Sequence, residues 1–371
     1  MRVFILTLGT RGDFELFLTL GRELQARGHS VTLGSSGFYA AQARAAGVGW
    51  ATVGGGTRDE LLAVLRSLSS CPDRAERTHL YYGKWLRPQL ETGRGAIGAT
   101  GALSEYFVSN LKMILRRAGG VMPGAVVTYD PPGAVGDLPR YQTGEHGGLI
   151  LDLVAMSKPL VDPSGEWGER YQFTGFWGPD DRAAPPLPLK EFVEAGPPPV
   201  VLTMGSMVMF DAGELIRGVT AALRLSGQRG VVVAGWAGGA AADRAGQLLC
   251  VDEVPYDWLF PRAACVIHHG GSGTVSAVLR AGRPSIVLPQ VACQDQFARI
   301  LTRAGLATGV FDARAIDPVA LAAAIRAAVG DGLPARRARE WQARVRADGG
   351  VKAAADLIES HWSVVRPDGP G

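Results

Sequence analysis

Residues 266–274 read Val266-Ile-His-His-Gly-Gly-Ser-Gly-Thr274, and an apolar helical pattern follows from Val275. An apolar strand that ends in glycines and leads directly into a helix is typical of parallel α/β units. The glycines let the backbone approach a ligand closely, and the N–H groups at a helix N-terminus attract anions. The stretch therefore predicts a phosphate site, with a tight turn that binds nothing as the alternative, because a glycine motif alone is weak.

The residues around this turn alternate between strands and helices in two similar copies. The first copy opens at residues 3–8 and the second at residues 200–204. Further strands are expected at 30–34, 49–53, 230–234, 248–251, 265–268 and 285–289. Strands separated by helices of this length favour an α/β fold with parallel sheets that are covered on both faces. Ligands of such sheets collect at the carboxyl ends of the strands, where the turn at residue 268 lies.

The sequence predicts four parts along the chain. These are an N-terminal Rossmann-like domain (1–180), a proline-rich linker (181–199), a C-terminal Rossmann-like domain (200–345), and a C-terminal helix with a frayed tail (346–371). The last helical pattern runs over about residues 335–361, and the C-terminal helix within 346–371 is expected to pack back on the N-terminal domain.

The stretch between residues 58 and 148 has weaker patterns. Helical periodicity is fair at 61–68 and at 105–117, and residues 125–128 favour a strand.

Composition narrows the class of protein. The 371 residues are 47% hydrophobic and 20% charged, with a net charge of +3, so disorder and nucleic-acid binding are not expected. The four cysteines have no metal-ligand spacing and fit a reduced cytosol better than a disulfide framework. No leader is evident, and the longest apolar stretch, at 231–242, is too short to span a bilayer. We expect a cytoplasmic protein without a transmembrane segment.

Two further stretches follow strands and carry polar side chains. In Gly9-Thr-Arg-Gly-Asp-Phe-Glu15, Asp13 stands at a helix start, where a carboxylate either caps the helix or serves as a base for a hydroxyl. In Pro289-Gln-Val-Ala-Cys-Gln-Asp-Gln296, the amides and the acid either bind sugar hydroxyls or form an ordinary solvated loop.

Several stretches, in order and in register, resemble the GT-B glycosyltransferases of the UDP-glycosyltransferase superfamily, in the branch of bacterial antibiotic and sterol glycosyltransferases. They are GTRGDFELFLTLGRELQARGH (9–29), EWGERYQFTGFW (166–177), TMGSM (203–207), VPYDWLFPRAACVIHHGGSGT (254–274) and LRAGRPSIVLPQ (279–290). The resemblance implies two Rossmann-like domains that face each other across a cleft, the first binding an acceptor and the second a nucleotide sugar.

The resemblance also implies roles for individual residues. Asp13 matches the proposed catalytic base, and Trp236 and Val254 match positions near the nucleobase and ribose. The residues matching the diphosphate site are Ser206, His269, Gly271, Ser272, Gly273 and Thr274.

The sugar end departs from the family pattern. The usual Asp-Gln or Glu-Gln pair falls on Cys293 and Gln294, so the acid is missing, while Asp295 and Gln296 form a shifted pair just beyond. The acceptor stretch at 139–153 is also short.

The implied activity is metal-independent, inverting transfer of a hexose from a UDP- or TDP-sugar to a hydroxyl of a small natural product, as in antibiotic biosynthesis. No cofactor is expected. An epimerase of nucleotide sugars and a non-catalytic partner of another transferase stay open, as does association into a homodimer or with an auxiliary protein.

Overall fold

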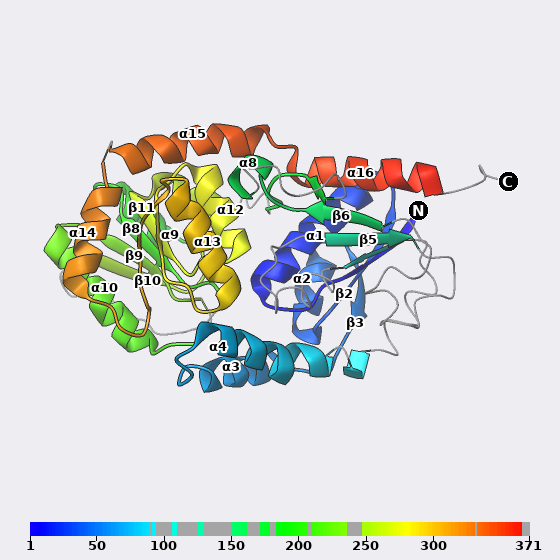
Figure 1. The fold of residues 1–371 in the computed structure, drawn as a ribbon, viewed down its shortest axis with the longest axis horizontal. Helices are drawn as coiled ribbons and strands as arrows, with labels where there is room; N and C mark the ends of the chain where they lie inside the picture. Colours follow the sequence, from blue (N-terminus) through cyan, green and yellow to red (C-terminus); the bar gives the residue numbers. More distant parts are fainter. Residues whose placement is uncertain are drawn as a thin grey trace. The chain divides into compact units, whose positions relative to one another are not determined.

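Two units, each built around its own sheet, make up the chain in the computed structural model (Figure 1). Unit 1 comprises Met1–Leu61, His79–Pro179 and Asp348–Gly371, and unit 2 comprises Leu62–Thr78 and Asp180–Ala347. The structure describes residues 1–89, 91–93, 106–109, 125–129, 150–161, 171–178, 183–206, 209–235, 247–330 and 332–365. The sequence patterns did not indicate that Leu62–Thr78 belongs with unit 2. The chain enters unit 2 within α3 (Arg58–Ser67) and leaves it within α4 (Arg74–Tyr81).

The sheet of unit 1 has the strand order β3-β2-β1-β4-β5-β6-β7. Its strands are β1 (Arg2–Leu6), β2 (Ser30–Ser35), β3 (Gly49–Thr52), β4 (Tyr106–Ser109), β5 (Ala125–Tyr129), β6 (Ile150–Val154) and β7 (Tyr171–Phe173). The order reverses at β1, which pairs in parallel with both β2 and β4. The expectation of a parallel sheet holds except at β5, which is antiparallel to β4 and to β6.

One element of unit 1 corrects the sequence interpretation. A helix was expected at 105–117, but Tyr106–Ser109 forms β4, in register with β1 from Val3 to Leu6. The aromatic and β-branched residues of this short segment suit a strand, and pairing in the centre of the sheet overrides a weak helical period. Residues 110–117 lie outside the described part of the chain. The strand expected at 125–128 is confirmed as β5.

The helices of unit 1 include α1 at its N-terminus and α16 at its C-terminus. They are α1 (Arg11–Ala26), α2 (Ala40–Ala45), α8 (Lys158–Val161) and α16 (Gly350–Val365). Helix α16 packs along α1. At the end of α1, Arg27 donates to Asp356 at 2.6 Å and to Glu359 at 2.8 Å. The C-terminal helix thus belongs to the N-terminal unit.

The sheet of unit 2 is parallel throughout, as expected, with the order β10-β9-β8-β11-β12-β13. Its strands are β8 (Val200–Thr203), β9 (Gly230–Val233), β10 (Leu248–Val251), β11 (Cys265–His268), β12 (Ser285–Val287) and β13 (Ala307–Val310). The order reverses between β8 and β11. In open α/β sheets this switch point is where ligands bind.

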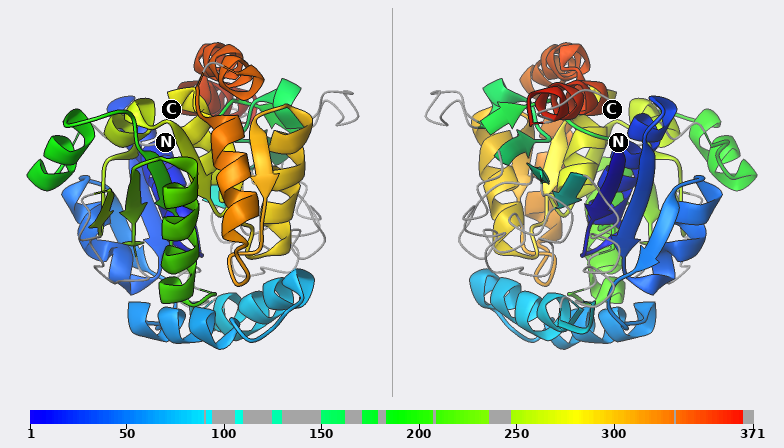
Figure 2. Two further views of the ribbon diagram at one scale, coloured as in Figure 1. Left: turned by 90° about the vertical axis from the view of Figure 1, so that its left-hand side faces the viewer. Right: turned by 90° about the vertical axis from the view of Figure 1, so that its right-hand side faces the viewer.

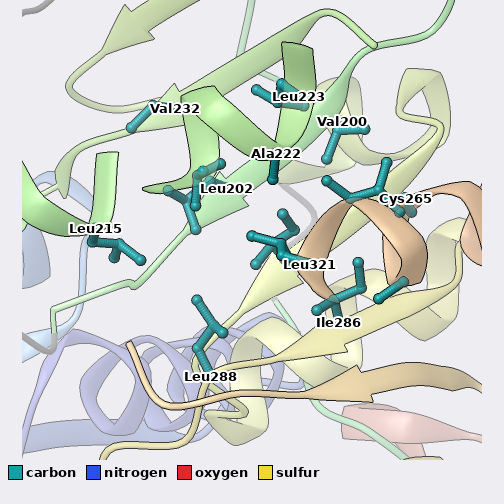
Figure 3. Packing of buried hydrophobic residues seen from close by; sticks show 14 of the residues in the cluster. Val200, Leu202, Leu215, Ala222, Leu223, Val232, Cys265, Ile286, Leu288 and Leu321 are labelled. Carbon is teal, nitrogen blue, oxygen red and sulfur yellow. The ribbon is translucent and has the colours of Figure 1, made fainter. Parts of the chain in front are cut away.

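Helices cover both faces of this sheet. Helices α10 (Ala212–Ser226) and α14 (Pro318–Ala328) lie side by side on one face (Figure 2) and close a core around Leu202, Ile286 and Leu321 (Figure 3). The opposite face packs against α9 (Leu187–Glu194), α11 (Tyr256–Leu259) and α12 (Ser272–Ala281).

Helix α9 corrects the expectation that residues 181–199 are only a linker. Leu189 is fully buried and Val193 is 7% exposed, so this stretch is part of the core of unit 2. The two apolar residues stand four positions apart and therefore share one helix face, which the density of prolines obscured in the sequence.

The C-terminal helical pattern also divides. Helix α15 (Leu333–Ala347) belongs to unit 2, and α16 begins at Gly350, which has φ +58°. One continuous helix over 335–361 is thus wrong, because the left-handed glycine ends the pattern. None of the helices in the described part of the chain combines the length and the apolar character needed to cross a bilayer. The cytoplasmic location stays a prediction.

Candidate functional site

The turn at 268–272 leaves a helix N-terminus open for an anion. Strand β11 ends at His268, α12 begins at Ser272, and the N-cap residue, Gly271, has no side chain to cap the helix. The N–H groups of Ser272, Gly273 and Thr274 are in the first turn, where a helix has no internal acceptor for them. These N–H groups and the positive end of the helix dipole favour a phosphate.

His269 lies where the turns after β8 and β11 meet. A β-carbon added at Gly205 would stand 2.9 Å from its Cε1 atom, and one added at Gly271 would collide with Nε2. The residue is 7% exposed, and Nδ1 is buried with no hydrogen-bond partner within the described residues. Burial lowers the pKa of His269 to about 4. The ring is therefore neutral at pH 7 and has one N–H to donate.

His268 makes a hydrogen bond within the turn itself. It is fully buried, and its Nδ1 accepts a hydrogen bond from the backbone N–H of Gly270 at 3.1 Å. Burial, together with the neighbouring His269, lowers the pKa of His268 to about 3. His268 therefore shapes the turn, and His269 remains the candidate for contact with phosphate.

The two buried histidines predict how stability changes with pH. Each has a folded pKa below the usual value of 6.5, so below that pH the unfolded chain binds more protons than the folded chain. The free energy of unfolding should fall as pH drops from 7 toward 4, by up to about 1.4 kcal/mol per pH unit for each histidine. His268→Gln should remove one contribution. Urea midpoints at pH 7 and pH 5 that differ equally in the parent and the variant would contradict this.

The other predicted donor residues are distributed around the same sheet edge. Ser206 follows β8 and is 6% exposed, and its neighbour Gly205 packs against His269, so the turn after β8 adjoins the turn after β11. Val254 lies between β10 and α11 and packs against the core on the α12 face. Trp236 lies outside the described residues. The assignments of Ser206 and Val254 to the diphosphate and the nucleoside stay predictions.

The expected sugar-binding residues have structural partners at the start of α13 (Ala292–Arg303). The Oε1 atom of Gln294 accepts from the backbone N–H of Gln290 at 2.7 Å and, as a helix cap, from that of the N-cap residue Val291 at 3.4 Å. The carboxylate of Asp295 pairs with Arg74 at 2.5 Å. Gln296, next along α13, is partly exposed. Of the acceptor groups expected for sugar hydroxyls, those of Gln294 and Asp295 thus have partners within the protein.

The sequence interpretation missed three residues of α4 that hold this loop. Arg74 contacts Asp295, Arg77 donates from Nε to the carbonyl of Gln290 at 2.8 Å, and Thr78 accepts from the N–H of Ala292 at 3.0 Å. Arg77 is only 1% exposed. A sequence signal was available, because residues 74, 77 and 78 share one helix face, but a polar helix face is usually solvated.

Asp13 caps α1 in unit 1. Its Oδ2 atom accepts from the backbone N–H of Thr10 at 3.1 Å and from the Thr10 hydroxyl at 3.4 Å. Gly9, with φ +144°, packs so closely on this carboxylate that a β-carbon would collide with it. The capping role foreseen from the sequence is confirmed, and the catalytic role stays a prediction.

Within the described residues, no three His, Cys, Asp or Glu side chains gather as a cluster that could hold a metal. Independence of a metal stays a prediction.

Comparison with known proteins shows which families the chain resembles. Residues 3–81 match the glycosyltransferase family 28 N-terminal domain, and residues 240–354 match the erythromycin biosynthesis protein CIII-like C-terminal domain. The chain is 29% identical to the O-mycaminosyltylonolide 6-deoxyallosyltransferase of Streptomyces fradiae, over 99% of this chain and 98% of that protein. It is 25% identical to a sterol 3-beta-glucosyltransferase of Arabidopsis thaliana, over 78% of this chain and 56% of that protein.

The fold has close counterparts among solved structures. One is the spinosyn rhamnosyltransferase, complexed with thymidine diphosphate, which aligns with a TM-score of 0.62 and 21% identity over 97% of this chain and all of that one. At this identity the likeness establishes the fold, and the GT-B architecture expected from the sequence is confirmed.

Proposed function

This chain is a GT-B glycosyltransferase, related to antibiotic and sterol glycosyltransferases and acting on a nucleotide sugar, and we propose the following specific reaction for it. It moves a hexose from a UDP- or TDP-sugar to a hydroxyl of a small natural product, with inversion at the anomeric carbon and without a metal.

The observation that carries this proposal is the uncapped N-terminus of α12 beside His269. In the proposed complex, the N–H groups of Ser272, Gly273 and Thr274 and the His269 ring donate to the diphosphate. Negative charge grows on the diphosphate as the sugar leaves. Fixed donors and a helix dipole stabilise this charge without reorganising, which is the work that a metal ion does elsewhere.

Asp13 supplies the base in this mechanism. The acceptor oxygen forms a bond to the anomeric carbon while the bond from that carbon to the diphosphate breaks, and the hydroxyl proton passes to the Asp13 carboxylate. An ordinary aspartate has a pKa near ~3.9, far below that of an alcohol, so the proton moves late, as the leaving group departs. Asp13 belongs to unit 1 and the diphosphate turn to unit 2.

The relatives support a natural product as acceptor. The Streptomyces fradiae relative takes its name from a glycosylated tylonolide, and the spinosyn rhamnosyltransferase is also known in complex with its aglycone. We extend this class of acceptor to the chain as a proposal. Which hydroxyl receives the sugar depends on the identity of this acceptor.

A binding screen followed by a hydrolysis assay tests the function. Calorimetry with UDP, TDP and their sugars should detect one preferred nucleotide, and the bound sugar nucleotide should be slowly hydrolysed to free sugar without an acceptor. Release of a sugar with the opposite anomeric configuration would support inversion. A donor epimerised without hydrolysis would favour an epimerase, and the absence of nucleotide binding would contradict the proposal.

A further inference from the structure

The loop at the start of α13 has a single carboxylate. Asp295 is the only acidic residue between Ser285 and Arg303. The loop lies directly against the diphosphate turn. Its Leu288 N–H donates to the carbonyl of His268 at 2.8 Å, and a β-carbon on Gly270 would stand 3.2 Å from the carbonyl oxygen of Gln294.

The carboxylate of Asp295 forms an ion pair with Arg74. The Nη1 and Oδ1 atoms are 2.5 Å apart, and the two side chains are 27% and 24% exposed. The loop that carries Asp295 is also fixed by two other residues on the same helix face as Arg74. Arg77 and Thr78 form hydrogen bonds with its backbone at Gln290 and Ala292. The partly buried ion pair is therefore held in place by its neighbours, unlike a mobile surface pair.

Two further arginines lie near the Arg74–Asp295 pair. Arg314 donates to the carbonyls of Cys71 and Pro72, which also accept from Arg77. Arg314 is itself paired with Asp312 and holds the pKa of that carboxyl at about 2. Arg74, Arg77 and Arg314 thus form one hydrogen-bonded group with Asp295 and Asp312 around the Cys71 and Pro72 carbonyls, which helps to hold Arg74 beside Asp295.

We propose that Arg74 is a positioning residue for donor choice: by pairing with Asp295, it withholds the loop's only carboxylate from sugar hydroxyls, so that the site favours a deoxyhexose over a fully hydroxylated hexose. The inference rests on the proposed function, since it requires a sugar nucleotide whose diphosphate lies on α12. A hydroxyl that donates to a free carboxylate gains a charge-assisted hydrogen bond, whereas a deoxy position has no such bond to lose.

The Arg74→Gln variant tests the inference. The measured quantities are the dissociation constants of TDP, TDP-glucose and TDP-glucose analogues that lack the 2-, 3-, 4- or 6-hydroxyl. If the parent binds UDP, the corresponding UDP series is used. The parent should bind at least one deoxy analogue more tightly than the glucose nucleotide. In Arg74→Gln the glucose nucleotide should bind about 5–10-fold more tightly, with little change for TDP alone. The Arg74→Lys variant, which keeps a cation, should retain the parent's preference.

A second variant separates release of the carboxylate from a general loosening of the loop. Asp295→Asn in the Arg74→Gln background should return the sugar preference to that of the parent, because no carboxylate remains to be released. Arg280→Gln serves as the matched control. Arg280 has similar exposure and forms an ion pair with Asp257 at the C-terminal end of α12, away from the diphosphate turn, and this variant should behave as the parent does.

The possible outcomes distinguish the two proposals. An unchanged ratio of glucose to deoxy affinity in Arg74→Gln, an equal change for TDP and its sugars, or a shift that persists in the double variant would overturn the role of Arg74. Failure of the parent to bind any of these nucleotides would instead refute the proposed function and, with it, this inference.

Discussion

Asp13→Asn should lower kcat by about 100-fold or more while the dissociation constant for UDP or TDP stays the same. An amide cannot take the proton from the acceptor hydroxyl, so the expected loss falls on the chemical step. The nucleotide is unaffected because its proposed contacts all lie in unit 2, whereas Asp13 lies in unit 1. Turnover with an acceptor, together with calorimetry of the nucleotide, measures both quantities.

The capping contact makes asparagine the informative replacement. Asp13 accepts from the N–H and the hydroxyl of Thr10, and the amide oxygen of asparagine can accept in the same way. Alanine would also remove the cap, at about 0.5–2 kcal/mol, and confuse stability with catalysis. Glu15→Gln is the matched control, because Glu15 is a nearby carboxylate paired with Arg11 at 2.5 Å. Unchanged turnover in Asp13→Asn would leave Asp13 with its capping role alone.

The sequence predicted the edge of the sheet where the candidate site lies, because local patterns specify it. Buried apolar runs become the parallel strands β8 and β11, and the glycines that follow them specify turns. The position of His269 against Gly205 was not evident from either motif alone. It follows from strand order, which brings the ends of β8 and β11 together although about sixty residues of chain separate them.

What could not be predicted depends on contacts between distant residues. Arg77 is buried against the carbonyl of Gln290, more than two hundred positions away, and no local pattern distinguishes it from a solvated arginine. The same is true of β4, whose pairing with β1 overrides its helical period. Asp295 illustrates the consequence for function. The sequence offered it as a substitute for the missing acid, and its partner Arg74 is visible only in the folded unit.

His269→Ala should weaken binding of UDP or TDP by about 10–100-fold, because a hydrogen bond to a charged group contributes about 1.5–3 kcal/mol. The neutral ring still donates one N–H to a phosphate oxygen, and its burial excludes water that would compete for it. The loss should be the same for the free nucleotide and for its sugar, since the proposed contact is with the diphosphate. Calorimetry of both ligands measures this.

The neighbouring histidine provides the control for this substitution. His268→Gln changes the other buried ring of the same turn, and the amide oxygen of glutamine can accept from the Gly270 N–H, as Nδ1 of His268 does. If phosphate recognition depends on His269, nucleotide affinity should survive His268→Gln and fall in His269→Ala. Equal affinity in the parent and in His269→Ala would remove His269 from the site and leave the helix N-terminus as the sole anion-binding feature. A comparable loss of nucleotide affinity in both variants would mean that the histidines act only by shaping the turn. The two rings have different proposed partners, and what they share is the backbone of this turn.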